Sequence, residues 1–221
     1  MAESKHLREF KAVWGASCQS MWAELLSLTI AETHLLSSYS QIPHDRLVCD
    51  LFYAPELKKR LNDLKKDTFL SRVDTYRATV ITNRIVILSA SFESYFSSFL
   101  DQFIKSKPKY FDKAAGTRTP AGDKLYGETI KTRGLTQRIE KFAELANAKI
   151  GIIKARTTYL DDVYILRNVL AHAAGSIDAH SASSLQHLTL PANQRISITS
   201  EQLLSLAAKV VEIAESLDKK I

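Results

Sequence analysis

Glycine and proline are scarce in this sequence. Its 221 residues include seven Gly and five Pro, too few for the many tight turns of an all-β fold. Hydrophobic residues make up 45% of the chain, which at this length is enough to bury a sizeable core. We therefore expect a single all-α domain over residues 1–221, with an N-terminal helical segment over 1–50 and a helical core over 69–221.

Cysteines and long apolar runs are also few. Cys18 and Cys49 have neither a metal-binding spacing nor a disulfide pattern, which favours a reducing compartment. No apolar run approaches the roughly 20 residues that cross a bilayer, and charged residues interrupt the first positions, where a signal peptide would lie. The sequence thus predicts a cytoplasmic protein without a membrane partner. Its net charge of +6 is compatible with a polyanion such as RNA.

Apolar residues recur at spacings of three and four in several stretches, as the 3.6-residue period of a helix requires. Helices are predicted over 3–39 (as one helix or two), 55–66, 69–106, 135–149, 158–174 and after Thr199. Thr158 with Asp161, and Thr199 with Gln202, have capping-box spacing. The basic residues of 55–66 are expected on a solvated face, and a contact with an RNA backbone is the alternative. Residues 185–190 and 195–198 resemble two short strands, which predicts a small hairpin before the last helix.

Helical periodicity is lost between residues 105 and 133, where Gly and Pro indicate a long exposed loop. Basic side chains alternate there with aromatic ones. This pattern suits single-stranded nucleic acid, because bases stack on rings and phosphates meet cations. Ordinary solvated loops share the composition, so both interpretations stay open. The candidate substrate-binding residues are Lys107, Lys109, Arg118 and Lys124.

Three polar residues interrupt the apolar helix predicted over 158–174, namely Arg167, Asn168 and His172. Burying such groups without partners costs free energy, so hydrogen bonds or a ligand must offset the cost. At about 100° per residue, Asn168 and His172 share one face with Asp161, whereas Arg167 points about 140° away from His172. Arg167 can join this polar line if its side chain wraps back, if the helix ends or distorts near His172, or if the two groups meet across a subunit contact.

A carboxylate lies in another apolar helix. Glu93 falls with Ser89 and Ser97 on a narrow polar line of the helix predicted over 69–106. A buried carboxylate needs a partner, and Arg167 is one candidate. Glu93 and Asp161 are therefore the candidate supporting residues, Glu93 either as an anchor for Arg167 or in the chemistry itself.

No metal site and no cofactor are predicted. His34 and His44 lie ten residues apart near the end of the first predicted helix, but no third ligand accompanies them. We interpret both as ordinary surface histidines.

The pattern Arg167-Asn168-x-x-x-His172 lies late on a helix that follows a long helix with an embedded Glu93. It resembles the signature of the HEPN superfamily (higher eukaryotes and prokaryotes nucleotide-binding domains), over the chain from residue 70 to the end. The resemblance implies a HEPN-like bundle of long antiparallel helices and a homodimer whose motif helices face each other. It also implies a metal-independent endoribonuclease in which Arg167, Asn168 and His172 are catalytic.

The chemistry of these side chains agrees with such an activity. To cleave RNA without a metal, the ribose 2′-OH must lose a proton and attack the adjacent phosphorus. Imidazole suits this transfer because its pKa lies near neutrality, and a guanidinium supplies fixed positive charge to the crowded phosphate. The expected products are a 2′,3′-cyclic phosphate and a 5′-hydroxyl. DNA, which lacks the 2′-OH, should resist cleavage.

One position departs from the family pattern. Ala174 stands where HEPN toxins paired with minimal nucleotidyltransferase antitoxins commonly carry Tyr. The departure indicates another branch, such as a phage-defence effector or a stand-alone toxin, with an antitoxin or a larger defence-system protein as a further partner. Two alternatives stay open: a catalytically silent HEPN module for dimerisation, nucleotide binding or regulation, and a purely structural role in which Arg167 bridges Glu93 or Asp161. The presence of both Arg167 and His172 favours the nuclease.

Overall fold

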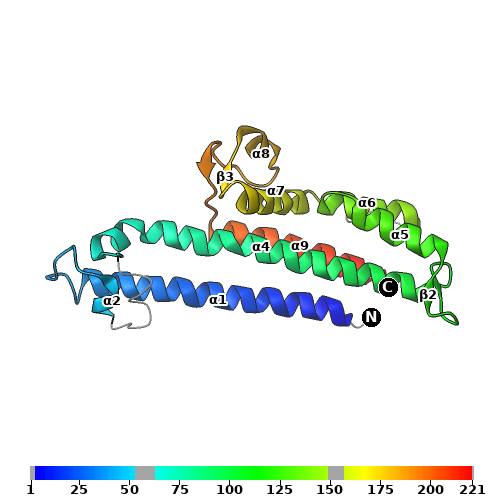
Figure 1. Ribbon diagram of the computed structural model, residues 1–221, viewed down its shortest axis with the longest axis horizontal. Coiled ribbons are helices and arrows are strands. Elements are labelled where there is room, and N and C mark those ends of the chain that lie inside the picture. The colour runs from blue at the N-terminus through cyan, green and yellow to red at the C-terminus, as the bar shows by residue number, and fades with distance from the viewer. Residues whose placement is uncertain (1–2, 53–62, 149–156, 221) are drawn as a thin grey trace. The chain divides into compact units, whose positions relative to one another are not determined.

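The computed structural model describes residues 3–52, 63–148 and 157–220 (Figure 1). Within these ranges, helices are joined by loops and by two pairs of two-residue strands, which confirms the predicted all-α fold. Contacts divide the chain into two compact units, Met1–Ser17 with Thr82–Ile221 and Cys18–Ile81. The assignment of residues 1–221 to a single domain stays a prediction. None of the helices in the described ranges combines the length and apolarity needed to span a membrane.

The first unit is built from helices and both strand pairs. Its helices are the first turns of α1 (Lys5–Leu36), the part of α4 (Lys66–Ser106) from Thr82, α5 (Pro120–Lys131), α6 (Leu135–Ala146), α7 (Thr158–His172), α8 (Ala179–Ser184) and α9 (Ser200–Asp218). The strands pair antiparallel, β1 (Phe111–Asp112) with β2 (Thr117–Arg118) and β3 (Ser176–Ile177) with β4 (Gln194–Arg195). Helix α7, which carries the motif, packs against α6 and α9.

A row of aromatic rings on α4 forms the centre of this unit's core. Phe92, Phe96, Phe99 and Phe103 follow one another at one-turn spacing and are buried. Phe142 of α6 lies edge-on against three of these rings, with its centroid 4.9 Å from that of Phe103. Edge-to-face pairs are favoured by the ring quadrupoles. The row therefore fixes α6 on α4, and α6 in turn supports α7.

Helix α9 closes the unit against α1 and α4. Its predicted apolar row is buried, and the predicted capping box between Thr199 and Gln202 is present. The hydroxyl of Tyr95 on α4 donates a hydrogen bond of 2.7 Å to the carbonyl of Ala214. Lys11 of α1 forms an ion pair with Glu215, with 2.6 Å between Nζ and Oε1. Helix α9 is thereby held against both α4 and the first turns of α1.

The second unit consists of α1 from Cys18, the short α2 (Val48–Leu51) and α4 up to Ile81. Helix α1 is unbroken, which decides between the one and two helices predicted for this stretch. Leu35 of α1, Val48 of α2, and Phe69 and Val73 of α4 form a small core. These four side chains bring the end of α1 and the start of α4 together in an antiparallel arrangement.

One predicted solvated residue of this unit is buried. Most of the helix predicted over 55–66 lies outside the described residues, but Lys66 begins α4 and is only 2% exposed. Its Nζ donates to the carbonyl oxygens of Tyr39 and Ile42, at 2.7 and 3.1 Å. The prediction of a solvated face is therefore wrong for Lys66, because the carbonyl groups after α1 supply the acceptors that a buried ammonium needs.

The segment 120–131 is a helix, not the predicted loop. Thr119 caps α5 by accepting a hydrogen bond of 3.2 Å from the backbone N–H of Gly122, and Pro120 occupies the first turn. These capping signals are present in the sequence. Leu125 is the one large apolar residue among the buried residues of α5. The helix therefore has no long apolar row, and hydrophobic periodicity alone does not detect the helix.

The predicted hairpin between 185–190 and 195–198 does not form. Strand β4 pairs with β3, so that Arg195 lies opposite Ser176, and α8 lies between the two strands in the sequence. An alternating pattern indicates which side of a strand is buried but not which strand it pairs with. The partner strand at 176–177 is too short to produce a pattern of its own.

Candidate active site

Helix α7 carries Arg167, Asn168 and His172 on its last turns and ends directly after them. The N–H of Gly175 donates to the carbonyl of Val169 at 3.2 Å, and Gly175 has a positive φ of 80°. This geometry terminates a helix, because the left-handed turn satisfies a carbonyl of the last turn. His172 is thus the final helical residue, and its side chain is exposed.

Arg167 is connected through its sequence neighbour to the polar line of α7, the face that carries Asp161, Asn168 and His172. Its Nη1 donates a hydrogen bond of 3.0 Å to Oδ1 of Asn168, and both side chains are half-buried. Two of the three predicted ways in which Arg167 could join this polar line are seen: its side chain wraps back as far as Asn168, and the helix ends at His172. A guanidinium has five N–H donors, and among the described residues only the bond to Asn168 uses one of them, so the others can meet an anionic ligand.

The imidazole of His172 has no hydrogen bond or ion pair within the described ranges. Five residues separate it from Arg167, which corresponds to about 7.5 Å along the helix axis and about 140° around it. An exposed imidazole at a helix end is accessible to a substrate from outside. Within one helix, however, the guanidinium and the imidazole point in different directions.

The two predicted supporting acids do not pair with Arg167. Glu93 is half-buried on α4, and its carboxylate has no hydrogen bond or ion pair with the residues that the structure describes; its backbone carbonyl accepts a hydrogen bond of 2.9 Å from the hydroxyl of Ser97. Asp161 is also half-buried; burial raises the pKa of its carboxyl, and the neighbouring carboxylate of Asp162 adds to the rise. The structure thus corrects the prediction that Glu93 anchors Arg167, and it contains neither ion pair of the purely structural alternative.

The four basic candidates of the 105–133 segment already have intramolecular contacts. Lys107 and Lys109 lie over aromatic rings at 5.6 and 5.1 Å, and Lys124 is 3.9 Å from a carboxylate of Glu128. Arg118 lies 3.8 Å from the centroid of the Tyr126 ring and 3.0 Å from a carboxylate oxygen of Asp101. Arg118 is therefore a structural side chain, whereas Lys109 and Lys124 are exposed and can still meet a phosphate.

Burial acts to raise the pKa of Asp101, but this effect is outweighed. Hydrogen bonds from Lys105 and Arg118 hold the pKa below its ordinary value. The carboxylate of Asp101 thus stays charged and binds both cations. This cluster further commits Arg118 to the fold.

A buried carboxylate that the sequence analysis missed organises the start of α7. Asp162 is fully buried and accepts hydrogen bonds from the backbone N–H groups of Gln186 and His187, at 2.9 and 2.8 Å. Burial raises the pKa of Asp162, although both hydrogen bonds act to lower it. Its position in the buried row of α7, beside Asp161, is the signal that could have found it.

The segment held by Asp162 packs a second histidine, His187, against the first turn of α7. The ring of His187 stacks on Tyr159 with 3.4 Å between centroids and 4° between planes, and its Nε2 lies 2.8 Å from Oγ1 of Thr158. The predicted capping box of Thr158 and Asp161 is wrong, because the N-cap is Thr157 and has no side-chain cap. Thr158 instead contacts His187.

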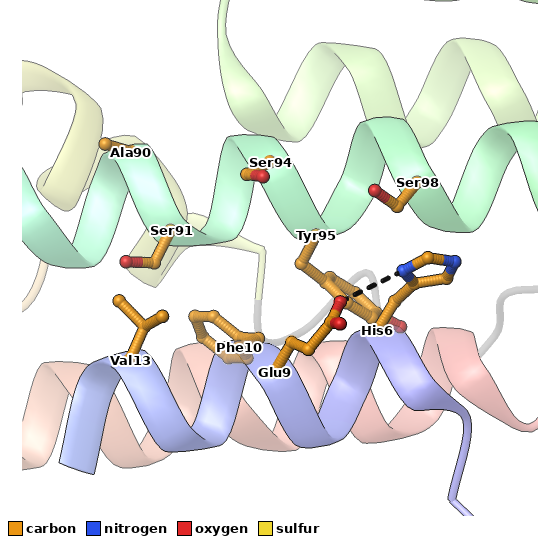
Figure 2. Close-up of a pocket in the computed structure, with 9 residues that line it drawn as sticks. All are labelled: His6, Glu9, Phe10, Val13, Ala90, Ser91, Ser94, Tyr95 and Ser98. Atoms are coloured by element: carbon orange, nitrogen blue, oxygen red, sulfur yellow. Dashed lines mark ion pairs between the residues drawn. The ribbon is translucent and has the colours of Figure 1, made fainter. Parts of the chain in front are cut away.

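A cavity of about 310 Å³ in the first unit lies between α1 and α4 (Figure 2). The rings of Phe10 and Tyr95 line it together with serines of α4, and His6 and Glu9 form an ion pair of 3.4 Å beside it. None of the motif residues of α7 lines this cavity. The motif lies instead at the end of α7, where His172 is exposed and Arg167 and Asn168 are half-buried, and an open helix end suits a long polymer better than a small enclosed ligand.

Comparison with known proteins gives no relative. No family model, no curated protein and no solved structure matches the chain.

Proposed function

We propose that this protein is a metal-independent endoribonuclease of the HEPN type. The observation that carries the proposal is the hydrogen-bonded pair Arg167–Asn168 on the same helix end as the exposed His172. A guanidinium, a carboxamide and an imidazole in this arrangement match the needs of RNA cleavage by an internal nucleophile. Neither Arg167 nor His172 is bound to an acid within the described ranges, so both remain open to a substrate.

In the proposed reaction, His172 removes the proton of a ribose 2′-OH, and the resulting oxygen attacks the adjacent phosphorus. The bond to the 5′-oxygen of the next nucleotide breaks, and that oxygen leaves as a 5′-hydroxyl after taking up a proton from solvent, to which His172 in turn releases the proton that it removed. Arg167 stabilises the charge that develops on the phosphoryl oxygens. Asn168 holds the guanidinium in place through its carbonyl oxygen and can donate its amide N–H to the phosphate.

The proposed active form is a homodimer in which two α7 helices face each other. Because Arg167 and His172 of one chain point about 140° apart, Arg167 of one copy completes the site with His172 of the other. The proposed biological setting is a toxin or a phage-defence effector, with an antitoxin or a larger defence-system protein as a further partner.

The proposal is tested by cleavage of single-stranded RNA in the presence of EDTA. Wild type should cut the RNA but not DNA of the same sequence, and His172→Ala should lower the rate by about 10²–10⁴-fold, the usual contribution of a general base. His180→Ala is the matched control, since His180 is exposed on α8 in the same unit. Unchanged cleavage by His172→Ala, or loss of wild-type cleavage in EDTA, would refute the nuclease. Saturable RNA or nucleotide binding without any cleavage would instead identify the catalytically silent module.

A further inference from the structure

One face of α1 in the second unit is apolar and uncovered. Trp22, Leu26 and Ile30 follow one another at four-residue spacing and are 49%, 60% and 48% exposed. On the opposite side of the same helix segment, Met21 and Leu35 are completely buried. A helix that is apolar on two sides needs cover on both, and a row of large exposed apolar residues indicates an interaction site.

This face also lacks charge. We define the outer face of α1 as Trp22, Leu26 and Ile30 together with their neighbours on that side, Gln19, Ala23, Thr29 and Thr33; none of these residues is charged. Residues 12–45 contain no Lys or Arg, and this is the longest such stretch in a chain that has 30 of them.

A cation that reaches the edge of this face is already bound to acids. Arg77 reaches Oγ1 of Thr29 at 3.3 Å, but its guanidinium is bound to Glu32 at 2.5 Å and to Asp74 at 2.9 Å. With its two carboxylates, this cluster at the edge of the outer face of α1 offers no free positive charge to a polyanion.

The missing charges decide between possible partners. Nucleic acid and anionic membrane surfaces are both held by Lys and Arg beside the apolar or aromatic residues, and the outer face of α1 has none. A net charge of +6 makes copies of this protein repel each other, and the outer face of α1 contributes none of that charge. An apolar, uncharged face of this kind is complementary to itself.

We propose that the outer face of α1 binds the same face of a second copy of this chain. Trp22, Leu26 and Ile30 form one ridge of residues four apart, and two such ridges interdigitate when helices cross at about −50°. A contact between identical faces has two-fold symmetry, which places the two Leu26 side chains at its centre. The contact is separate from the α7 pairing and does not depend on the proposed nuclease activity.

Sedimentation of the full chain over a range of concentrations tests the proposal. Leu26→Glu buries two like charges at the centre of the contact and should weaken one association step by at least about tenfold. Ser27→Glu is the matched control, because it adds the same charge about 100° around the same helix, and it should associate as wild type does. Circular dichroism checks that both variants are folded. Equal association of Leu26→Glu and wild type, or a monomeric wild type at every concentration, would overturn the proposal.

A second variant tests the two-fold arrangement. Under mild oxidation, Leu26→Cys should form a disulfide-linked dimer well above the level of wild type, which retains Cys18 and Cys49 as the background. No increase in cross-linking would overturn a contact centred on Leu26. Flotation of wild type with phosphatidylserine vesicles, if Leu26→Glu abolished it without changing self-association, would identify a membrane as the partner and would also overturn the proposal.

Discussion

Lys66 shows how one side chain holds a segment of this protein in place. Its ammonium group is buried where α4 begins and donates to carbonyl oxygens of the turn that follows α1, those of Tyr39 and Ile42. A buried cation is costly unless hydrogen bonds compensate for the lost water. The same hydrogen bonds satisfy carbonyl groups of the turn, so a single residue fixes the turn on α4.

Replacing Lys66 by Met should lower the free energy of unfolding by about 1–3 kcal/mol, because the carbonyl oxygens lose their donor while the apolar stem is kept. Urea denaturation of the full chain measures the change. Lys65→Met is the control, since Lys65 is exposed, and it should unfold as wild type does. If the two variants had the same urea midpoint of unfolding, the buried ammonium would contribute nothing to stability.

Asp162 predicts a pH dependence of stability. Its folded-state pKa is raised, so the protonated carboxyl is the form that the fold prefers. Its contribution to stability is therefore fully present below the unfolded-state pKa of about 3.9 and is lost as pH rises through the folded-state pKa. Asp162→Asn removes this titration and keeps one acceptor for the two backbone N–H groups.

The free energy of unfolding of wild type minus that of Asp162→Asn should accordingly fall as pH rises from about 4 to about 7. Denaturation curves at both pH values measure it. Asp161 is present in both proteins, so the part of its raised pKa that comes from burial cancels in the difference. The part that comes from the Asp162 carboxylate is lost in Asp162→Asn. In wild type the two charged carboxylates repel each other as pH rises, which lowers the difference in the same direction. If the difference instead grew with pH, the folded-state pKa of Asp162 would be lowered, which would contradict a pKa raised by burial.

Among the elements, α5 packs unusually close to the chain that precedes it. A Cβ atom placed on Gly122 would lie 2.0 Å from the carbonyl oxygen of Tyr110, a backbone atom that cannot easily move. Gly122→Ala should therefore destabilise the protein by about 1–3 kcal/mol, as overpacking does. Gly127→Ala in the same helix meets open space and should stabilise it by up to about 1 kcal/mol. Thermal unfolding compares the two, and a neutral Gly122→Ala would contradict the close approach.

Local signals decide which elements could be predicted from the sequence. The apolar period predicts α4, α7 and α9, and the Thr199–Gln202 box predicts where α9 begins, because each signal resides within the element itself. The pairing of β3 with β4 depends on residues almost twenty positions apart, and the sequence does not specify it. The environment of Lys66 likewise depends on carbonyl groups of another segment, which composition cannot show.

The candidate site likewise has features that the local sequence reveals and features that depend on distant segments. The sequence identifies Arg167, Asn168 and His172, because polar groups in an apolar helix are conspicuous. Their partners are harder to predict: the guanidinium of Arg167 bonds to the adjacent Asn168 and not to Glu93, since an adjacent amide is within reach of the side chain at no cost in chain closure. The role of Asp162 depends on the backbone of residues 186 and 187, far along the chain.

At the scale of the whole molecule, the proposed active site requires two copies. Arg167→Ala and His172→Ala should each be inactive alone. Mixed and allowed to exchange subunits, they should recover activity in heterodimers, in which one of the two shared sites keeps both groups. Exchange is checked by mass spectrometry of the mixture. Heterodimers without any activity would contradict a site shared between copies.

The most direct test of the account is the chemistry of the RNA ends that the purified protein produces. Mass spectrometry of a cleaved oligonucleotide should find 2′,3′-cyclic phosphate on one fragment and 5′-hydroxyl on the other, with no cut where a single 2′-deoxyribose replaces the ribose before the scissile phosphate. Fragments with 3′-hydroxyl and 5′-phosphate ends, or cleavage that continues after the 2′-deoxy substitution, would contradict it.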